Sequence, residues 1–579
     1  MLYRRCDIAI AILYPVRDAD MPSARIRHQE IFSALMHSAY LPAEVPPAIT
    51  TRHFAAYCKV NYNSIKSKET SVLSKIVTRF DKFNVPRENQ TRRDLALVHP
   101  ASQARVSMVI TKNHREIRTI IGESQISLYN PEPDLKNYRA FKGVSFANLD
   151  KKRSDIARRS CYVLSADISR FFYTIYTHSI PWAVLGKTKV KELMNGGKKG
   201  KKGGKPFHWT DELDRALQSC QSRETFGIPV GPDTSRIIAE VLLSGIHNDE
   251  GVAKSIGGRP GFRLVDDFFI GFNSELECAS TLTSLRNALS NYNLQLNDDK
   301  TALKPSQAIF MDRWRYELMQ QRIRQEDAKS QANDIRKLTD LALYHAHSLG
   351  NSFPVKWIVQ KLISIQYDDG NFGLILSTLL RLSREFPVCI SHVATFIINN
   401  KKKCQGPLAI SLIHEWLSVV FKTHARHSHD FEVAWALVIC GALKIKVSRA
   451  EFSDYHSSTC SAVYAILGLL NEKGLLKEKF AAFNWRATVK KEGIDGEHWL
   501  VYYESVRRKW TKDKQMVSNV KNHPFMSDLL NNGVTFLDDT IFGDVSINLA
   551  KRRIRKINSM LMIHDEDHMD ESSFGLASM

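Results

Sequence analysis

The chain has 579 residues, with 81 lysines and arginines against 61 aspartates and glutamates, so its formal net charge is 81 − 61 = +20. This excess of positive charge favours an anionic partner such as a nucleic acid. Hydrophobic residues make up 43% and charged residues 25% of the chain, close to the average of globular proteins. That composition excludes a disordered, collagen-like or coiled-coil protein.

The nine cysteines are spread along the chain without a CxxC pair, which argues against a zinc finger or a disulfide framework. The apolar run 8–14 is too short for a signal peptide, and Pro15 ends it. No stretch approaches the ~20 apolar residues that a membrane span needs. We therefore expect a soluble, cytoplasmic protein without a membrane partner.

Mixed α/β structure is predicted for residues 1–320. Strand-like runs at 107–122, 162–168 and 261–272 alternate with helical segments, and proline and glycine separate them. Between them, the segment 195–206 carries five lysines and five glycines, a composition that predicts a solvated surface loop with a secondary potential for phosphate contact.

Helical periodicity dominates residues 321–579. Helix-length apolar segments follow one another with short polar or proline-containing connections, which predicts a stack of antiparallel helices. No fixed sequence period is visible. A HEAT-like array with degenerate repeats is therefore one interpretation of this domain. A basic stretch at 551–556, followed by acidic residues at 565–571, predicts an exposed tail.

Three carboxylates stand where phosphoryl-transfer chemistry would need them. Asp167 stands next to the last residue of the alternating run YVLSADI, so it is expected at the end of a strand. Asp266 and Asp267 interrupt the apolar run RLVDDFFIGF, which predicts a tight β-hairpin with both carboxylates at its tip. Adjacent acids on an apolar hairpin are costly unless a cation lies among them, and two divalent ions bound by carboxylates can activate a hydroxyl and stabilise a leaving oxygen.

An Asp-Asp pair alone is a weak signal, because the chain contains four. Asp266 and Asp267 have strand-like apolar flanks, whereas the pairs 298–299, 368–369 and 538–539 lie beside asparagine, lysine, glycine or threonine. Those three pairs are predicted to be turns or helix caps.

The segments SADISRFF, TFGIPVGPDTS and RLVDDFF, in this order and at these separations, resemble motifs A, B and C of reverse transcriptases. YTHSIPWAVLGK, GIPVGPDTSRIIAE, NLQLNDDKT and the early YLPAEVPP make the chain similar to the prokaryotic defence-associated group that includes AbiK-like abortive-infection enzymes. The resemblance covers about residues 30 to 310. It implies a fingers-palm domain, and the group also carries an α-helical repeat domain after it.

The resemblance implies roles for individual residues. Asp167, Asp266 and Asp267 are the expected catalytic residues, and together with Ile168 they form the metal-binding set for two Mg²⁺ ions, for which Mn²⁺ can substitute. The expected nucleotide-binding positions are Phe172, which would exclude a ribose 2′-hydroxyl, Arg118 at the triphosphate, Gly231 and Ser235 on the nucleotide and template side, and Lys300 near the leaving pyrophosphate.

Three observations qualify this assignment. Leu264 stands where the motif usually has the aromatic residue of YxDD, which puts primer-end contacts in doubt but not metal binding. Lys112 and Arg115 are neighbouring candidates for the role expected of Arg118. Phe172 also has the alternative of simple core packing.

A histidine cluster at His424, His427 and His429 has no cysteine or acidic partner at ligand spacing, so a polar loop is predicted there.

The leading hypothesis is a DNA polymerase of reverse-transcriptase type that uses dNTPs in antiphage abortive-infection defence. The group includes enzymes that make DNA without a template and attach it to a tyrosine of the protein itself, and others that copy RNA, and the sequence does not choose between them. An RNA-templated enzyme with a non-coding RNA and an inactive nucleic-acid-binding scaffold stay as alternatives. A homo-oligomer is expected by analogy with the group.

Overall fold

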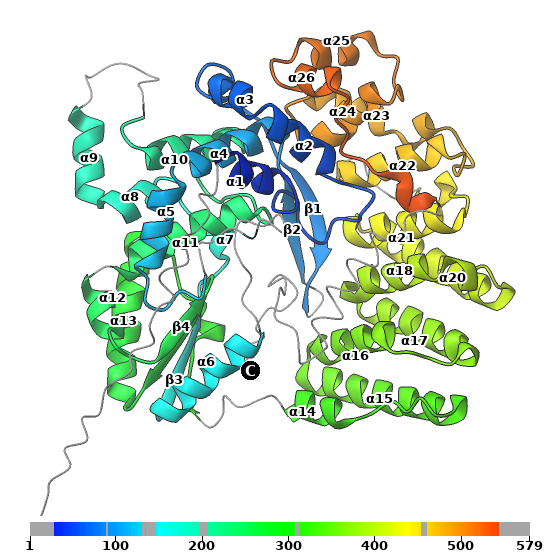
Figure 1. Ribbon diagram of the computed structural model, residues 1–579, viewed down its shortest axis with the longest axis horizontal. Helices are drawn as coiled ribbons and strands as arrows, with labels where there is room; N and C mark the ends of the chain where they lie inside the picture. The colour runs from blue at the N-terminus through cyan, green and yellow to red at the C-terminus, as the bar shows by residue number, and fades with distance from the viewer. Residues whose placement is uncertain are drawn as a thin grey trace, which may run out of the picture.

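The computed structural model describes residues 28–88, 91–129, 134, 146–196, 206–248, 250–306, 313–452 and 460–543 (Figure 1). The apolar run 8–14, most of the lysine-rich segment 195–206 and the tail from 551 lie outside these residues.

The first part of the chain builds helices around a two-stranded hairpin, which we call the fingers hairpin. The elements are α1 His28–Met36, α2 Arg52–Val60, α3 Tyr62–Lys68, β1 Asp81–Pro86, β2 Arg92–Leu97, α4 Pro100–Lys112 and α5 His114–Gly122. The two strands are antiparallel, with Asp81 opposite Leu97 and Pro86 opposite Arg92.

The palm follows, as a four-stranded sheet with helices. Its elements are α6 Phe146–Arg159, β3 Tyr162–Asp167, α7 Phe171–Thr174, α8 Ser179–Leu185, α9 Lys187–Gly196, α10 Trp209–Ser219, α11 Asp233–His247, α12 Glu250–Ile256, β4 Gly261–Leu264, β5 Asp267–Phe272, α13 Glu275–Asn291 and β6 Ala302–Pro305. The strand order is β4-β5-β3-β6, and every neighbouring pair is antiparallel. Helices α6 and α13 pack against this sheet.

From α14 onward the described chain is helical. The helices are α14 Arg313–Gln320, α15 Ala328–Leu349, α16 Phe353–Ser364, α17 Phe372–Glu385, α18 Ile390–Asn399, α19 Lys401–Cys404, α20 Pro407–Val420, α21 Asp430–Leu443, α22 Ser461–Glu472, α23 Trp485–Glu492, α24 Trp499–Arg507, α25 Lys514–Asn522 and α26 Met526–Asn531. They stack as a column from α14 and α15 at one end to α25 and α26 at the other (Figure 1). The predicted change from mixed to helical structure is confirmed.

Local sequence explains the boundaries of these helices. Asp327 begins α15 because its side chain accepts a hydrogen bond from the backbone N–H of Ser330, and Gly350 ends it in the left-handed region at φ +63. The apolar residues between them recur at helical spacing and are buried. Tryptophans anchor the stack, since Trp416, Trp435, Trp485 and Trp499 are fully buried.

One predicted element is wrong. Residues 107–122 were expected to be strand-like, but they form the end of α4 and all of α5. Proline at the first position of α4 and the His99 side chain, which accepts from the N–H of Ala101, start a helix upstream of this run. Ile117 and Ile121 then recur at a helical spacing of four and are both buried.

The N-terminal segment and the helical stack pack on each other. Ile49 forms a β-bridge with Leu537, and Arg52 forms an ion pair with Asp538 at 2.6 Å. Trp499 of α24 donates from its indole N–H to the carbonyl of Leu97 at 2.9 Å. Fingers, palm and helical stack therefore share one buried core.

No helix in the described part of the chain has both the length and the apolar character that crossing a membrane requires.

Candidate active site

Strand register brings the three predicted carboxylates together. In the antiparallel pairing of β3 with β5, Asp167 lies directly opposite Asp267, so both side chains leave the sheet on one face. Asp266 occupies the two-residue turn between β4 and β5. One carboxylate oxygen from each of the three residues lies within 4.8 Å of the others.

The turn that carries Asp266 is strained, and a buried ion pair supports it. Val265, a β-branched residue, has φ +51, a left-handed conformation that is unfavourable for such a side chain. The guanidinium of Arg263 donates to the carbonyl of Val265 at 2.7 Å and forms two hydrogen bonds with the carboxylate of Glu240, at 3.0 and 2.8 Å. Arg263 and Glu240 are both fully buried. This ion pair positions the turn.

Asp167 has partners of its own. The ammonium of Lys300 lies 3.3 Å from its Oδ2, and the amide of Asn297 donates to the same oxygen at 3.3 Å. Lys300 is the last residue of the 3-10 turn Asp298–Lys300, which follows α13, so the residue expected near the leaving group contacts one of the three carboxylates.

The other two carboxylates are held in an unfavourable electrostatic state. Burial, and then the charge of Asp167, raise the pKa of Asp266. Burial, and then the charges of Asp266 and Asp167, raise the pKa of Asp267. Mutual repulsion of this kind is relieved when a cation lies among the carboxylates.

The three aspartates fit a divalent metal ion. Their oxygens converge, and carboxylate oxygen is the donor that hard divalent cations prefer. The buried side chain of Ile168 has no donor atom, so only its main-chain carbonyl could take part. Bound ions would supply Lewis acidity toward a nucleotide phosphate and an attacking hydroxyl.

A cavity of about 270 Å³ opens in front of these carboxylates. Its walls come from three parts of the chain. Asp167, Asp266 and Asp267 belong to the palm, the fingers hairpin adds further residues, and Lys356, His392 and Phe431 come from the helical stack. The contribution of the helical stack was not predicted from the sequence.

Three of the predicted nucleotide-binding residues line this cavity: Phe172, Gly231 and Lys300. Phe172 is half-buried, and its ring packs 5.4 Å from that of Phe171. Gly231 has φ +120, and a Cβ there would lie 2.5 Å from Cγ of Pro42. Glycine is therefore required where the motif B loop meets the early YLPAEVPP segment.

The other two predicted nucleotide-binding residues lie elsewhere. Arg118 is exposed on α5, and Ser235 is buried in α11; the described residues that line the cavity do not include either. Two arginines of the fingers hairpin, Arg87 and Arg93, line it instead. Burial and the neighbouring charge of Arg93 lower the pKa of Arg87.

This pair of guanidinium groups favours a polyanion such as a triphosphate. The available sequence signal was the group of closely spaced arginines at positions 87, 92 and 93.

The remaining Asp-Asp pairs are structural, as predicted. Residues 298–299 begin a 3-10 turn, and Asp368 and Asp538 cap the 3-10 helices that follow them by accepting from Gly370 and Thr540.

The prediction for the histidine cluster is wrong in one respect. Glu432, in the first turn of α21, places a carboxylate beside His424 and His429. Glu432 could not be recognised as a partner from the sequence, because His429 precedes α21 and Glu432 lies inside it. Their His-x₂-Glu spacing therefore crosses the start of a helix.

The sheet, its clustered carboxylates and the basic hairpin above them define the class: a nucleotidyltransferase with a polymerase palm. Residues 98–312 match the reverse transcriptase (RNA-dependent DNA polymerase) family. This match indicates a nucleotidyltransferase that polymerises DNA. The predicted fold class, a fingers-palm domain followed by an α-helical domain, is confirmed.

Solved telomerases are similar at a lower level. Apo telomerase from Candida tropicalis has a TM-score of 0.29 and 10% identity, covering 74% of this chain and 73% of that chain. Telomerase from Candida albicans in complex with a TWJ fragment of telomeric RNA has a TM-score of 0.25 and 12% identity, covering 62% of this chain and 70% of that chain. Curated proteins yield no match. The family match therefore identifies the class.

Proposed function

We propose that this chain is a DNA polymerase that extends a hydroxyl of the protein itself with dNTPs, without copying a template, and that it acts in the cytoplasm in antiphage abortive-infection defence. The observation that carries the self-primed part is the small cavity in front of the carboxylates, to whose wall the helical stack contributes. The defence role is supported by the sequence resemblance to the AbiK-like group.

Enclosure limits what the site admits. A cavity of about 270 Å³ is near the lower end of the ~300–1,000 Å³ that single small ligands occupy. One nucleotide is of this size, whereas a primer–template duplex is far larger. Lys356 and Phe431 of the helical stack form part of the wall of this cavity.

The chain's own residues have distinct roles in this reaction. Asp167, Asp266 and Asp267 would hold two Mg²⁺ ions, which supply the Lewis acidity for nucleotidyl transfer. Arg87 and Arg93 would bind the triphosphate. Phe172, beside the three carboxylates, would close the space of a ribose 2′-hydroxyl, and Lys300 and Gly231 would complete the nucleotide site. Arg118 and Ser235 are not among the described residues that line the cavity, so we propose no direct nucleotide contact for them.

The test is incubation of purified protein with Mg²⁺ or Mn²⁺ and labelled dNTPs, without primer or template. We expect label that migrates with the protein on a denaturing gel and is released from it by protease or nuclease. Product that forms only on added RNA and primer would contradict self-priming.

RNA-templated synthesis from a non-coding RNA is a second candidate, favoured by the RNA-dependent family that residues 98–312 match. Sequencing of the nucleic acid that copurifies with the protein, and of the DNA product, separates the two candidates. A product complementary to a copurified RNA supports templated synthesis. Absence of product in every condition, with phage protection unchanged in an Asp266→Ala/Asp267→Ala variant, would instead support the scaffold.

We also propose that the helical region mediates self-assembly into a homo-oligomer. The resemblance to the AbiK-like group supports this, and solution mass measurement tests it. We expect a mass of several chains at micromolar concentration, and the mass of one chain would contradict the proposal.

A further inference from the structure

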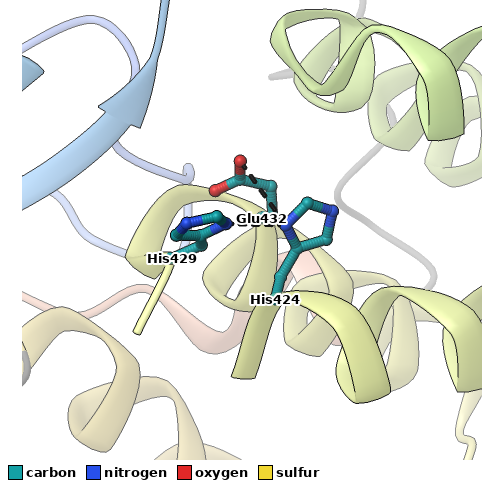
Figure 2. A group of neighbouring side chains, drawn as sticks. All are labelled: His424, His429 and Glu432. Carbon is teal, nitrogen blue, oxygen red and sulfur yellow. Dashed lines mark hydrogen bonds and ion pairs between the residues drawn. The ribbon is translucent and has the colours of Figure 1, made fainter. Parts of the chain in front are cut away.

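Metal-ligating side chains gather at a second place, where α20 leads into α21 (Figure 2). A π-helical turn, Phe421–Ala425, follows α20 and carries His424. His429 stands at the N-cap of α21, and Glu432 lies in its first turn. π-helical turns are rare, and they occur often at functional sites because they redirect a side chain.

The ligand atoms are spaced as a metal site requires. Nδ1 of His424 lies 2.9 Å from Nδ1 of His429 and 3.8 Å from Oε1 of Glu432. One donor atom from each of the three side chains lies within 4.8 Å of the others. Tetrahedral zinc with bonds of about 2.0–2.1 Å separates its ligand atoms by about 3.3 Å, between the two measured distances.

Burial keeps these histidines in the form that binds metal. His424 and Glu432 are buried, and His429 is half-buried. Burial lowers the pKa of His424, and burial together with the charge of Arg92 lowers the pKa of His429 to about 4. These lowered pKa values favour the neutral imidazole, which has a lone pair available for a metal ion.

The carboxylate is oriented by the fingers hairpin. Arg92 of β2 donates to both oxygens of Glu432 at 2.8 Å. Each carboxylate oxygen has a second lone pair, so Oε1 can face the histidines while it accepts from Arg92. Outer partners of this kind fix metal-ligating carboxylates in proteins. Phe431, next to Glu432, lines the catalytic cavity.

We propose that His424, His429 and Glu432 bind one Zn²⁺ ion, with water at the fourth position, and that this ion fixes the start of α21 against the fingers hairpin. Two imidazoles and one carboxylate are a donor set that suits zinc. The site is distinct from the three aspartates of the palm, and it does not depend on the proposed function.

Zinc content of the full-length protein tests this proposal. Wild-type protein, His424→Ala, His429→Ala and the control His414→Ala, an exposed histidine of α20, are incubated with zinc sulfate, desalted and analysed for metal. We expect wild type and the control to retain one more zinc per chain than either ligand variant. Zinc bound at the palm is common to all four proteins and cancels in this comparison.

Two further measurements keep the outcome decisive. Zinc should raise the unfolding temperature of wild type and His414→Ala but not of His429→Gln, which keeps a polar side chain of similar length, and circular dichroism checks that this variant is folded. Co²⁺ should give the visible absorption of a tetrahedral site in wild type and not in His429→Gln. Equal zinc content and equal zinc-induced stabilisation in all variants would overturn the proposal.

Discussion

Phe172 is the residue that we expect to control the choice between dNTPs and rNTPs. Its half-buried ring lines the cavity beside Asp167 and packs on Phe171. Truncation in Phe172→Ala would open space for a 2′-hydroxyl. Because one steric contact of this kind contributes about 1–3 kcal/mol, we expect the preference for dNTPs over rNTPs to fall about 10–200-fold. Competition assays with labelled dNTP and rNTP measure this ratio, and an unchanged ratio would assign Phe172 to core packing.

Substitution of Arg93 tests which arginine side chains bind the triphosphate. Arg93→Ala removes a charge-assisted hydrogen bond of about 1.5–3 kcal/mol, so we expect KM for dNTP to rise about 10–100-fold. The matched change Arg118→Ala removes an exposed arginine of α5 outside the cavity wall. A larger rise in KM for Arg118→Ala than for Arg93→Ala would restore the assignment made from the sequence.

The β4–β5 hairpin is the element on which the site depends, and Arg263 supports it. Arg263→Met would leave the carboxylate of Glu240 buried without its cation, and breaking a buried pair from one side costs about 3–5 kcal/mol. We expect a loss of this size in the free energy of unfolding, measured by denaturant titration. Arg263→Met/Glu240→Met should recover part of it, whereas no recovery would show that packing, and not the uncompensated charge, sets the cost.

Elements with strong local signals could be predicted from the sequence. The run around Asp266 and Asp267 contains a two-residue turn between apolar strands, and it folds as such a hairpin. The strand-like prediction for 107–122 was wrong because β-branched residues favour strands, although here they recur at helical spacing. The N-cap at His99 starts a helix before this run. The roles of Arg87 and Arg93 could not be predicted, because their place at the cavity depends on where the fingers hairpin packs.

At the scale of the whole molecule, the fingers hairpin is fastened to the helical stack. Glu88 accepts from Lys356 at 2.9 Å and from Ser352 at the start of α16, and Arg92 pairs with Glu432. These partners lie more than 250 residues apart in the chain. No local sequence pattern indicates such distant pairs. The sequence therefore predicted two successive domains, but not that the helical stack forms part of the cavity wall.

The contact between these two parts also predicts how stability depends on pH. Burial lowers the pKa of His99 to about 3, and its ring packs against Trp499 of α24 at 5.7 Å. In the unfolded chain this imidazole has its ordinary pKa near 6.5. The unfolded state therefore binds more protons below pH 6.5, and stability is lost as pH falls from there toward 3, by up to ~1.4 kcal/mol per pH unit.

Denaturant titrations at pH 7, 6 and 5 measure this effect. His99→Asn keeps an acceptor for the cap of α4 but does not titrate, so its stability should fall less steeply than that of wild type. Parallel pH profiles for the two proteins would show that His99 is not the group responsible.

The proposed reaction requires that Asp167, Asp266 and Asp267 together bind divalent ions and support nucleotide transfer. Its most direct test is the rate of labelled dNTP incorporation by purified wild type, Asp266→Asn and Asp369→Asn, where Asp369 belongs to an exposed Asp-Asp pair of the helical stack. Loss of a metal ligand worth several kcal/mol predicts a fall of about a thousandfold in Asp266→Asn and a normal rate in Asp369→Asn. Incorporation by Asp266→Asn at the wild-type rate would contradict it.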